Sequence, residues 1–165
     1  MDVIKNFLPE EEYKNIKNIV LSSHFPWFYN DTAVPKIDEK IPQFTHSVYE
    51  NYVPVSTYYR DIIPILKKLN PVTLFRIKFN LNYKTPTVVE TGIHSDIYPN
   101  EFRYKSAVMF FNTCDGYCRI GDEKIMSEDN KLLIFDAHEN HTGSTCSNTD
   151  RRIVLSLIYA SRENK

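Results

Sequence analysis

The C-terminal half of the chain is divided into short apolar segments by turn residues, and this pattern restricts the fold more than any other feature. From residue 73 onwards, runs of β-branched and aromatic residues alternate with clusters of Gly, Asn, Asp and Pro, as expected for short strands joined by tight turns. The expected strands lie at about residues 73–83, 88–94, 104–112, 117–121, 123–127, 131–136, 140–145 and 151–160. Eight short strands at this spacing predict a mainly β fold, either a sandwich or a jelly roll.

The N-terminal part, residues 1–72, has a different pattern that predicts two helices. Proline followed by three glutamates at residues 9–12 favours a helix start, and apolar residues at helical spacing continue to about residue 22. A second helix is expected from residue 57 or 58 to Leu69, where Asn70-Pro71 ends it. The other residues predict a lead-in strand within residues 1–8 and a loop that contains a short strand near residues 44–49.

Length, charge and cysteine content point to one intracellular domain. We expect a single domain over residues 1–165, in which residues 1–72 support a β core of residues 73–160. The formal net charge of −1 argues against general binding to nucleic acid. Three cysteines form an odd set, and neither a signal segment nor a membrane-spanning run is visible. We therefore expect a soluble cytoplasmic protein without membrane contact, as a monomer or a weak dimer.

The stretch from Gly92 to Asp96 carries the first part of a candidate metal site. In an extended segment, residues two apart point to the same side, so the His94 imidazole and the Asp96 carboxylate should project together. A second imidazole comes from His141 within residues 140–143. Two histidines and one carboxylate form the facial triad typical of non-haem Fe(II) oxygenases, which leaves other coordination positions open. We predict His94, Asp96 and His141 as metal ligands.

A pair of arginines begins the last predicted strand. Arg151 and Arg152 precede an apolar run that ends at Tyr159. A guanidinium can bind a carboxylate through two parallel, charge-assisted hydrogen bonds. Because this strand follows His141 closely, one of the two arginines is a candidate for binding the distal carboxylate of a small dicarboxylic co-substrate.

These residues together resemble the signature of the Fe(II)- and 2-oxoglutarate-dependent dioxygenases. The signature consists of His94-x-Asp96, then His141-Thr-Gly, then an arginine ten or eleven residues later. The resemblance covers residues 73–160 and is greatest to the prolyl-hydroxylase-like branch, which has short members in phage and bacterial genomes. It implies a cupin-like double-stranded β-helix, with two N-terminal helices packed on one sheet. It also implies Fe(II) as the bound metal, with 2-oxoglutarate and O₂ as co-substrates.

The resemblance assigns further residues to the co-substrate pocket. Arg152 would pair with the 5-carboxylate of 2-oxoglutarate, because family members often carry a small hydroxyl residue four positions later, and Ser156 fits only Arg152. Family prolyl hydroxylases often bind the same carboxylate with a tyrosine on the strand after HxD, where this chain has Phe110. Tyr83 and Ser156 are therefore the candidates for additional contacts.

The activity implied by the resemblance is hydroxylation of an unactivated C–H bond, coupled to conversion of 2-oxoglutarate to succinate and CO₂. The implied substrate is a prolyl or another amino-acid residue, either in a peptide or in a small molecule. By their positions, Trp27, Tyr98 and Arg103 are candidate substrate contacts.

Two other classes of protein remain open at this point. One is a cupin-like module that binds metal or 2-oxoglutarate without turnover. The other is a metallohydrolase with a zinc-bound water, for which Glu90 and Glu139 are the nearest candidate bases. His138 competes with His141 as a ligand but lies in an apparent turn. The Cys114–Cys118 pair lacks the second pair that a closed zinc site requires.

Overall fold

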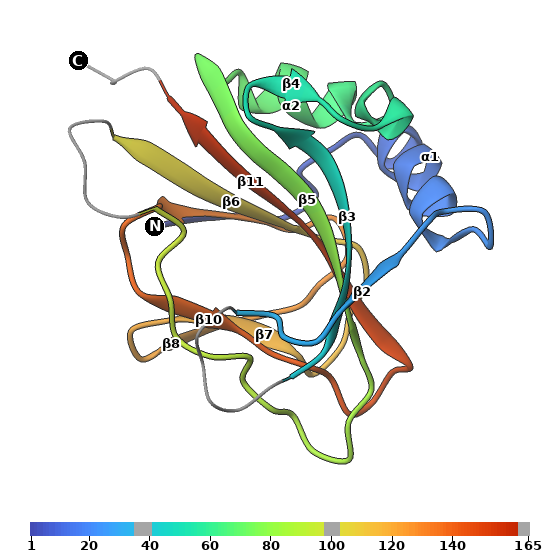
Figure 1. The fold of residues 1–165 in the computed structure, drawn as a ribbon, viewed down its shortest axis with the longest axis vertical. Helices are drawn as coiled ribbons and strands as arrows, with labels where there is room; N and C mark the ends of the chain where they lie inside the picture. Colours follow the sequence, from blue (N-terminus) through green and yellow to red (C-terminus); the bar gives the residue numbers. More distant parts are fainter. Residues whose placement is uncertain (35–40, 98–102, 162–165) are drawn as a thin grey trace.

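Two antiparallel sheets and two helices make up the computed structural model, which describes residues 1–34, 41–97 and 103–161 (Figure 1). The larger sheet has the strand order β1-β9-β6-β11-β5-β3-β2, with β4 paired to β3. Its strands are β1 (Asp2–Ile4), β2 (Phe28–Asn30), β3 (Gln43–Glu50), β4 (Val53–Pro54), β5 (Thr73–Tyr83), β6 (Tyr104–Phe110), β9 (Leu132–Asp136) and β11 (Arg151–Ala160). The smaller sheet has the order β10-β7-β8, with β7 (Tyr117–Ile120), β8 (Glu123–Met126) and β10 (His141–Gly143). The prediction of a mainly β protein with two helices is confirmed.

The segment of residues 84–94 lies along β10 as an irregular edge of the smaller sheet. The chain pairs there through isolated bridges between Glu90 and Ser144 and between His94 and His141, not through the regular strand predicted at residues 88–94. Gly92 has a φ of 109°, a conformation outside the β region that glycine adopts readily and that interrupts a regular strand. The antiparallel meeting of the second and seventh predicted strands is nevertheless present at His94 and His141.

The helices begin and end close to their predicted positions, with one interruption. Helix α1 spans Glu10–Leu21, and its first turn carries the three glutamates. The predicted helix of residues 57–69 is divided into a 3-10 turn at Thr57–Tyr59 and α2 at Ile63–Leu69. Proline in the first turn of α2 explains the division, because it cannot donate a backbone hydrogen bond to the preceding turn.

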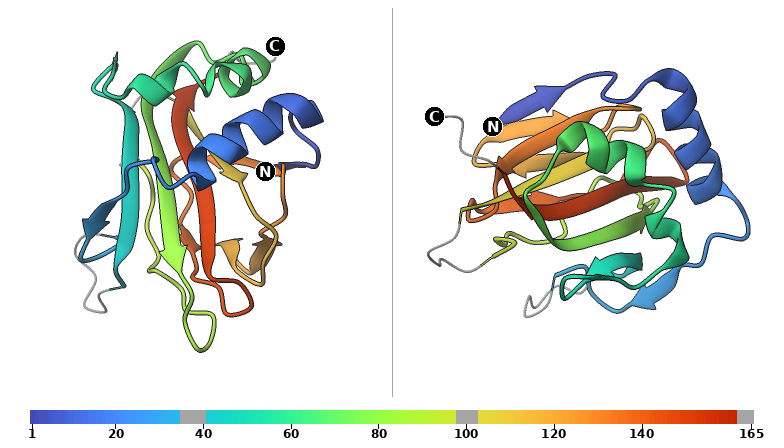
Figure 2. Two further views of the ribbon diagram at one scale, coloured as in Figure 1. Left: turned by 90° about the vertical axis from the view of Figure 1, so that its right-hand side faces the viewer. Right: turned by 90° about the horizontal axis from the view of Figure 1, so that it is seen from above.

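Both helices cover the outer face of the larger sheet (Figure 2). Tyr13, Ile16 and Val20 of α1 are buried in one apolar cluster that also contains residues of α2 and the outward-facing side chains of β5 and β11. A second cluster, which includes Phe110 and Phe135, joins the inner face of the larger sheet to Cys118 and Ile125 of the smaller sheet. Side-chain alternation therefore assigns one face of β5 and β11 to helix packing and the other face to the space between the sheets.

The N-terminal region contributes more than the helical support that was expected of residues 1–72. Strand β1 pairs with β9, and β3 pairs with β5 over most of its length. The short strand predicted near residues 44–49 is present as β3, which begins at Gln43. Polar and apolar residues alternate along β3, which explains why one of its faces can line the space between the sheets. Neither helix in the described residues is long and apolar enough to cross a membrane.

Candidate functional site

His94, Asp96 and His141 meet between the two sheets. One potential ligand atom from each residue lies within 4.8 Å of the other two. The backbones of His94 and His141 exchange two hydrogen bonds of 2.9 and 2.8 Å, which brings their rings to a centroid distance of 4.4 Å. Asp96 Oδ2 lies 3.7 Å from His141 Nε2. Residues separated by more than 40 positions in the sequence thus form one cluster of two imidazoles and a carboxylate.

Backbone carbonyls orient both imidazole rings. His94 Nδ1 is 3.1 Å from the Gly92 carbonyl oxygen, and His141 Nδ1 is 3.0 Å from the Glu139 carbonyl oxygen. An Nδ1–H that donates to a carbonyl leaves Nε2 with a free lone pair, which is the usual arrangement of a metal-binding histidine. Burial lowers the pKa of His94, and the neighbouring His141 ring lowers it further, so the neutral form that binds metal is favoured.

The Asp96 carboxylate is oriented by two side chains of the larger sheet. Arg76 Nη2 donates to Oδ1 at 2.9 Å, and Ser106 Oγ donates to Oδ2 at 2.6 Å. These bonds fix a side chain that is only 5% exposed. The donor set of two imidazoles and one oriented carboxylate fits a divalent metal such as iron, and it leaves coordination positions for other ligands.

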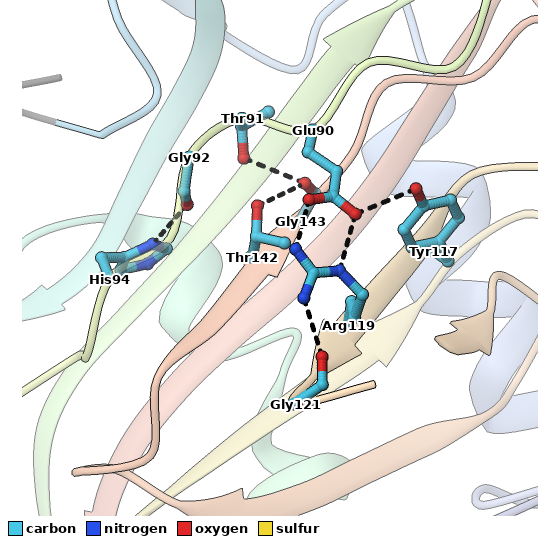
Figure 3. Close-up of polar contacts among 9 residues, drawn as sticks. All are labelled: Glu90, Thr91, Gly92, His94, Tyr117, Arg119, Gly121, Thr142 and Gly143. Carbon is cyan, nitrogen blue, oxygen red and sulfur yellow. Dashed lines mark hydrogen bonds and ion pairs between the residues drawn. The ribbon is translucent and has the colours of Figure 1, made fainter. Parts of the chain in front are cut away.

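Figure 3 shows a cluster of polar contacts that fixes the chain just before His94. Arg119 donates to both carboxylate oxygens of Glu90, at 2.8 Å from Nε and 2.5 Å from Nη2, and the Tyr117 hydroxyl donates at 3.0 Å. Arg119 Nη1 also donates to the Gly121 carbonyl oxygen at 2.7 Å. Since residues 84–94 have no regular ladder, this two-bond ion pair attaches the irregular segment to β7.

A cavity extends from the three-residue cluster into the space between the sheets. It contains about 590 Å³ of empty volume, which includes the part open to solvent. His94, Asp96 and His141 lie on its wall, and β5 and β11 form its opposite side. The residues that line it from those two strands are Arg76, Lys78, Asn80, Asn82, Arg152, Val154 and Ser156.

Arg152 lies in this cavity with only 2% of its surface exposed. Its guanidinium donates to Ser127 Oγ, to the Ser144 carbonyl oxygen and to Cys118 Sγ at 3.1 to 3.3 Å. No carboxylate among the residues that the structure describes pairs with it. A buried charge without a counterion is costly, so the cavity is suited to an anion.

Phe110 and Gly116 both lie close to the Arg152 side chain. The guanidinium carbon lies 5.5 Å from the centroid of the Phe110 ring. Gly116 passes so close that a Cβ atom there would lie 2.5 Å from Arg152 Cδ, which excludes a larger residue without rearrangement. The neighbouring Arg151 is exposed, as strand alternation requires.

Of the two residues predicted to assist the arginine, the structure brings only one to the cavity. Ser156 lines it, four positions after Arg152 on the same face of β11. Tyr83 does not line it and is 37% exposed at the end of β5. Alternation along β5 directs Asn82 inward and its neighbour Tyr83 outward, so the cavity is lined by Asn82 and not, as expected, by Tyr83.

The two candidate substrate contacts that the structure describes, Trp27 and Arg103, do not line the cavity. Trp27 packs against the Phe25 ring at a centroid distance of 5.0 Å and belongs to the helix-facing core. Arg103 is exposed and lines neither this cavity nor the adjoining one. Tyr98 lies outside the described residues. Trp27 is therefore a packing residue of the helix-facing core, away from the cavity where it was expected to contact substrate.

The rival residues have structural roles elsewhere. His138 Nδ1 is 3.3 Å from the Ile97 carbonyl oxygen, and this residue is not part of the three-ligand cluster. Cys114 and Cys118 are free, buried thiols, as is Cys146. Glu90 is bound by Arg119, whose hydrogen bonds hold the pKa of that carboxyl below its ordinary value.

Sequence reasoning missed the inward-facing polar residues of β5. The alternation Arg76-x-Lys78-x-Asn80-x-Asn82 is visible in the sequence and marks one face of a strand as polar. Its importance becomes clear only when that face is seen to lie opposite the three-ligand cluster.

No family model matches the sequence, and no curated protein matches it. Solved structures match its fold over nearly the whole chain. A Pseudomonas putida prolyl-4-hydroxylase is 15% identical with a TM-score of 0.64, covering 98% of this chain and 92% of that one. A 2OG-Fe(II) oxygenase family protein from Burkholderia pseudomallei is 11% identical with a TM-score of 0.70, covering 96% and 84%. A Trichoplax adhaerens prolyl hydroxylase, solved with a hypoxia inducible factor peptide fragment, is 12% identical with a TM-score of 0.68, covering 96% and 82%. The chain therefore has the fold of the 2-oxoglutarate- and Fe(II)-dependent oxygenases.

Proposed function

We propose that this protein is an Fe(II)- and 2-oxoglutarate-dependent oxygenase that hydroxylates an unactivated C–H bond. One observation carries the proposal: a cluster of two histidines and one aspartate shares a cavity with a buried arginine that has no carboxylate partner among the described residues. The first feature suits a divalent metal, and the second suits an organic acid that binds beside the metal. The fold of known 2-oxoglutarate- and Fe(II)-dependent oxygenases supports the same assignment.

The residues have separate roles in this proposal. His94, Asp96 and His141 hold the Fe(II), with Arg76 and Ser106 orienting the aspartate. Arg152 binds the 5-carboxylate of 2-oxoglutarate, with Asn82 registered beside it, and Ser156 lines the same cavity farther along β11. Iron, when bound, supplies O₂ activation and the redox chemistry.

We infer that the rest of the molecule serves to position these groups and exclude water. The two sheets form a double-stranded β-helix, in which residues 1–165 act as a single domain. The apolar cluster around Phe110 and Phe135 closes the space between the sheets beside Arg152 and His141. This cluster excludes water on the side away from the cavity entrance. Because the surroundings are then less polar than water, the attraction between Arg152 and a bound carboxylate is stronger.

The alternative of a zinc metallohydrolase lacks a suitable base. Glu90 is ionised and bound to Arg119 and Tyr117, and Glu139 is exposed. Neither residue lines the cavity. A cupin-like module that binds without turnover remains a competitor, and turnover distinguishes it from an oxygenase.

The test has a binding step and a turnover step. Anaerobic protein is loaded with Fe(II), and 2-oxoglutarate binding is measured before O₂ is admitted and succinate is assayed. We expect metal-dependent binding of 2-oxoglutarate and more succinate from the wild type than from Asp96→Ala. Binding without succinate would support the non-catalytic module. Absence of binding in the wild type would refute the proposed function.

A further inference from the structure

A second cavity adjoins the first and has its own charged lining. It contains about 1110 Å³ of empty volume, including the part open to solvent. Arg76, Lys78, His94 and Asp96 line both cavities. Strand β3 contributes only polar residues to the second cavity, namely Gln43, Thr45, Ser47 and Glu50. This second space, here called the outer cavity, is where a substrate can approach the three-ligand cluster.

Lys78 lies where the two cavities meet. In the larger sheet it is registered between Ser156 of β11 and Ser47 of β3. Ser156 lines the inner cavity and Ser47 lines the outer one. The lysine therefore stands on the sheet face opposite the metal ligands, between the proposed co-substrate pocket and the outer cavity.

Three of the four charged side chains that line the outer cavity have polar partners in the described part of the chain. Asp96 is bound to Arg76, and Glu50 accepts a 2.5 Å hydrogen bond from Ser47. The half-buried Lys78 makes no hydrogen bond or ion pair with any described residue. An ammonium group that is partly removed from water and left unpaired is costly, so this position favours an incoming anion.

The protonation of Lys78 agrees with its surroundings. Burial lowers its pKa to about 8, and the positive charge of Arg76 acts in the same direction, while Asp96 and Glu50 oppose the shift only in part. A bound anion would restore stabilisation of the charged form.

The position of Lys78 also separates it from the proposed 2-oxoglutarate carboxylate site. Arg152 is registered with Asn82 on β5, which lies four positions from Lys78. Four residues correspond to about 13 Å of strand. Arg152 and Lys78 can therefore serve two different anionic groups.

We propose that Lys78, with Arg76 beside it, binds an anionic group of the substrate, so that the substrate is a small acidic molecule and not a neutral prolyl residue within a peptide. The anionic group is a carboxylate or a phosphate, since both accept hydrogen bonds from an ammonium. A free amino acid bound through its carboxylate meets this requirement. This inference rests on the proposed function, because it names the substrate class of the same site.

The test measures anion binding to protein loaded with Ni(II) and 2-oxoglutarate, so that no turnover occurs. Inorganic phosphate and acetate are titrated calorimetrically into the wild type, Lys78→Met and Lys67→Met. Lys67 is the matched control, because it is an exposed lysine on α2, which packs on the opposite face of the sheet. Lys78→Gln is measured in parallel, which keeps the test decisive if the methionine variant does not fold.

We expect the Lys78 variants to bind the anions at least tenfold more weakly, while Lys67→Met resembles the wild type and 2-oxoglutarate affinity stays within about twofold. Tighter binding of phosphate would indicate a phosphorylated substrate, and tighter binding of acetate a carboxylic acid. An anion on the metal itself would bind the variants and the wild type alike.

Two results would overturn the inference. Unchanged anion affinity in the Lys78 variants would show that this lysine binds no anion. Loss of 2-oxoglutarate affinity equal to the loss of anion affinity would assign Lys78 to the co-substrate. If the wild type binds no 2-oxoglutarate, the proposed function fails, and the same titration of the Ni(II)-loaded protein still tests the lysine separately.

Discussion

Two cations on the inner face of the larger sheet are the most informative single residues of this protein. Arg152 is buried with a thiol, a hydroxyl and a carbonyl as neutral partners, and Lys78 is half-buried without a partner among the described residues. Folding alone gains little from either charge, because desolvation opposes the burial of an ion. Bound anions would supply the negative partners that these two charges lack among the described residues.

The first prediction concerns Arg152. Replacement by methionine keeps most of the side-chain volume and removes the charge, so the dissociation constant for 2-oxoglutarate should rise at least tenfold, corresponding to about 1.4 kcal/mol or more. The affinity for Ni(II) alone should change by less than about twofold, since Arg152 is not in the three-ligand cluster. Both affinities can be measured by calorimetry.

Arg151→Met is the matched control for that experiment. Arg151 begins the same strand but is exposed, so its variant should bind 2-oxoglutarate as the wild type does. An equal loss in both variants would show that the strand phase assigned to the co-substrate is wrong.

The second prediction uses the lowered pKa of Lys78, which is about 8 in the folded protein and about 10.4 in an unfolded chain. Between these values the unfolded state binds more protons, so the free energy of unfolding of the metal-free protein should rise with pH. The expected rise from pH 8 to 10.5 is on the order of 1–3 kcal/mol.

Urea denaturation at several pH values measures this effect. Other groups titrate in the same range, so the quantity of interest is the difference between the wild type and Lys78→Met. A difference that stays constant from pH 7 to 10.5 would show that the lysine titrates normally in the folded state.

Among the structural elements, the irregular segment of residues 84–94 is the most dependent on side chains. It presents His94 without a regular strand, and it is attached by isolated bridges, by single backbone hydrogen bonds and by the ion pair between Glu90 and Arg119. The pair is about one quarter exposed, so its contribution to global stability should be modest. Its local effect on the position of His94 should be larger.

The third prediction concerns this ion pair. Arg119→Met should accelerate amide hydrogen exchange in residues 85–94 and weaken Ni(II) binding about three- to tenfold, because His94 is less well positioned. Global unfolding should change little, because an ion pair near the surface contributes little to stability. Exchange is measured by mass spectrometry and metal affinity by calorimetry.

A double-mutant cycle on metal affinity tests whether Glu90 and Arg119 act through their ion pair or through separate effects of each residue. Glu90→Gln and Arg119→Met should each weaken metal binding, and the double variant should be no worse than Arg119→Met alone. Additive losses would mean that the two side chains act independently. Wild-type metal affinity in both single variants would show that the ion pair does not position His94.

At the scale of the whole molecule, one face of the larger sheet packs in the core and the other face lines the candidate site. Its outer face is apolar and carries the two helices, whereas its inner face is largely polar along β3 and β5 and faces the three-ligand cluster. Figure 2 shows the helices gathered on the outer side. Because successive side chains of a strand point to opposite faces, the same strands can serve both purposes.

The fourth prediction tests this separation. Ile16 of α1 is 2% exposed and packs on the outer face, so Ile16→Ala should destabilise the protein by about 2–5 kcal/mol. The affinity for 2-oxoglutarate in the folded variant should remain within about twofold of wild type. Urea denaturation and calorimetry measure the two quantities.

Lys14→Ala is a suitable control, since Lys14 is an exposed residue of the same helix and should change stability by about 0.5 kcal/mol or less. A large loss of 2-oxoglutarate affinity in folded Ile16→Ala would show that the two faces of the sheet are coupled.

Local patterns in the sequence were sufficient for the elements whose signals are local. The glutamates after Pro9 and the apolar spacing that follows predicted α1, and the turn residues around residues 112–116 and 121–122 separated β6, β7 and β8. Arg152 was chosen over Arg151 through the family resemblance, and alternation along β11 buries Arg152 and exposes Arg151. These predictions succeeded because helix and strand periodicity act over a few residues.

Tertiary structure decided the features that depend on distant partners. The sequence order of His94, Asp96 and His141 suggested a site, but only the pairing of residues 84–94 with β10 brings their ligand atoms together. Trp27 was misplaced because its packing against Phe25 is not visible locally. Tyr83 was chosen for its hydroxyl, although the alternation along β5 turns it outward. The sequence around Lys78 did not indicate that this residue lies at a binding site. Its unpaired charge acquires meaning only because three adjacent strands and the opposite sheet enclose it, which no short stretch of sequence can specify.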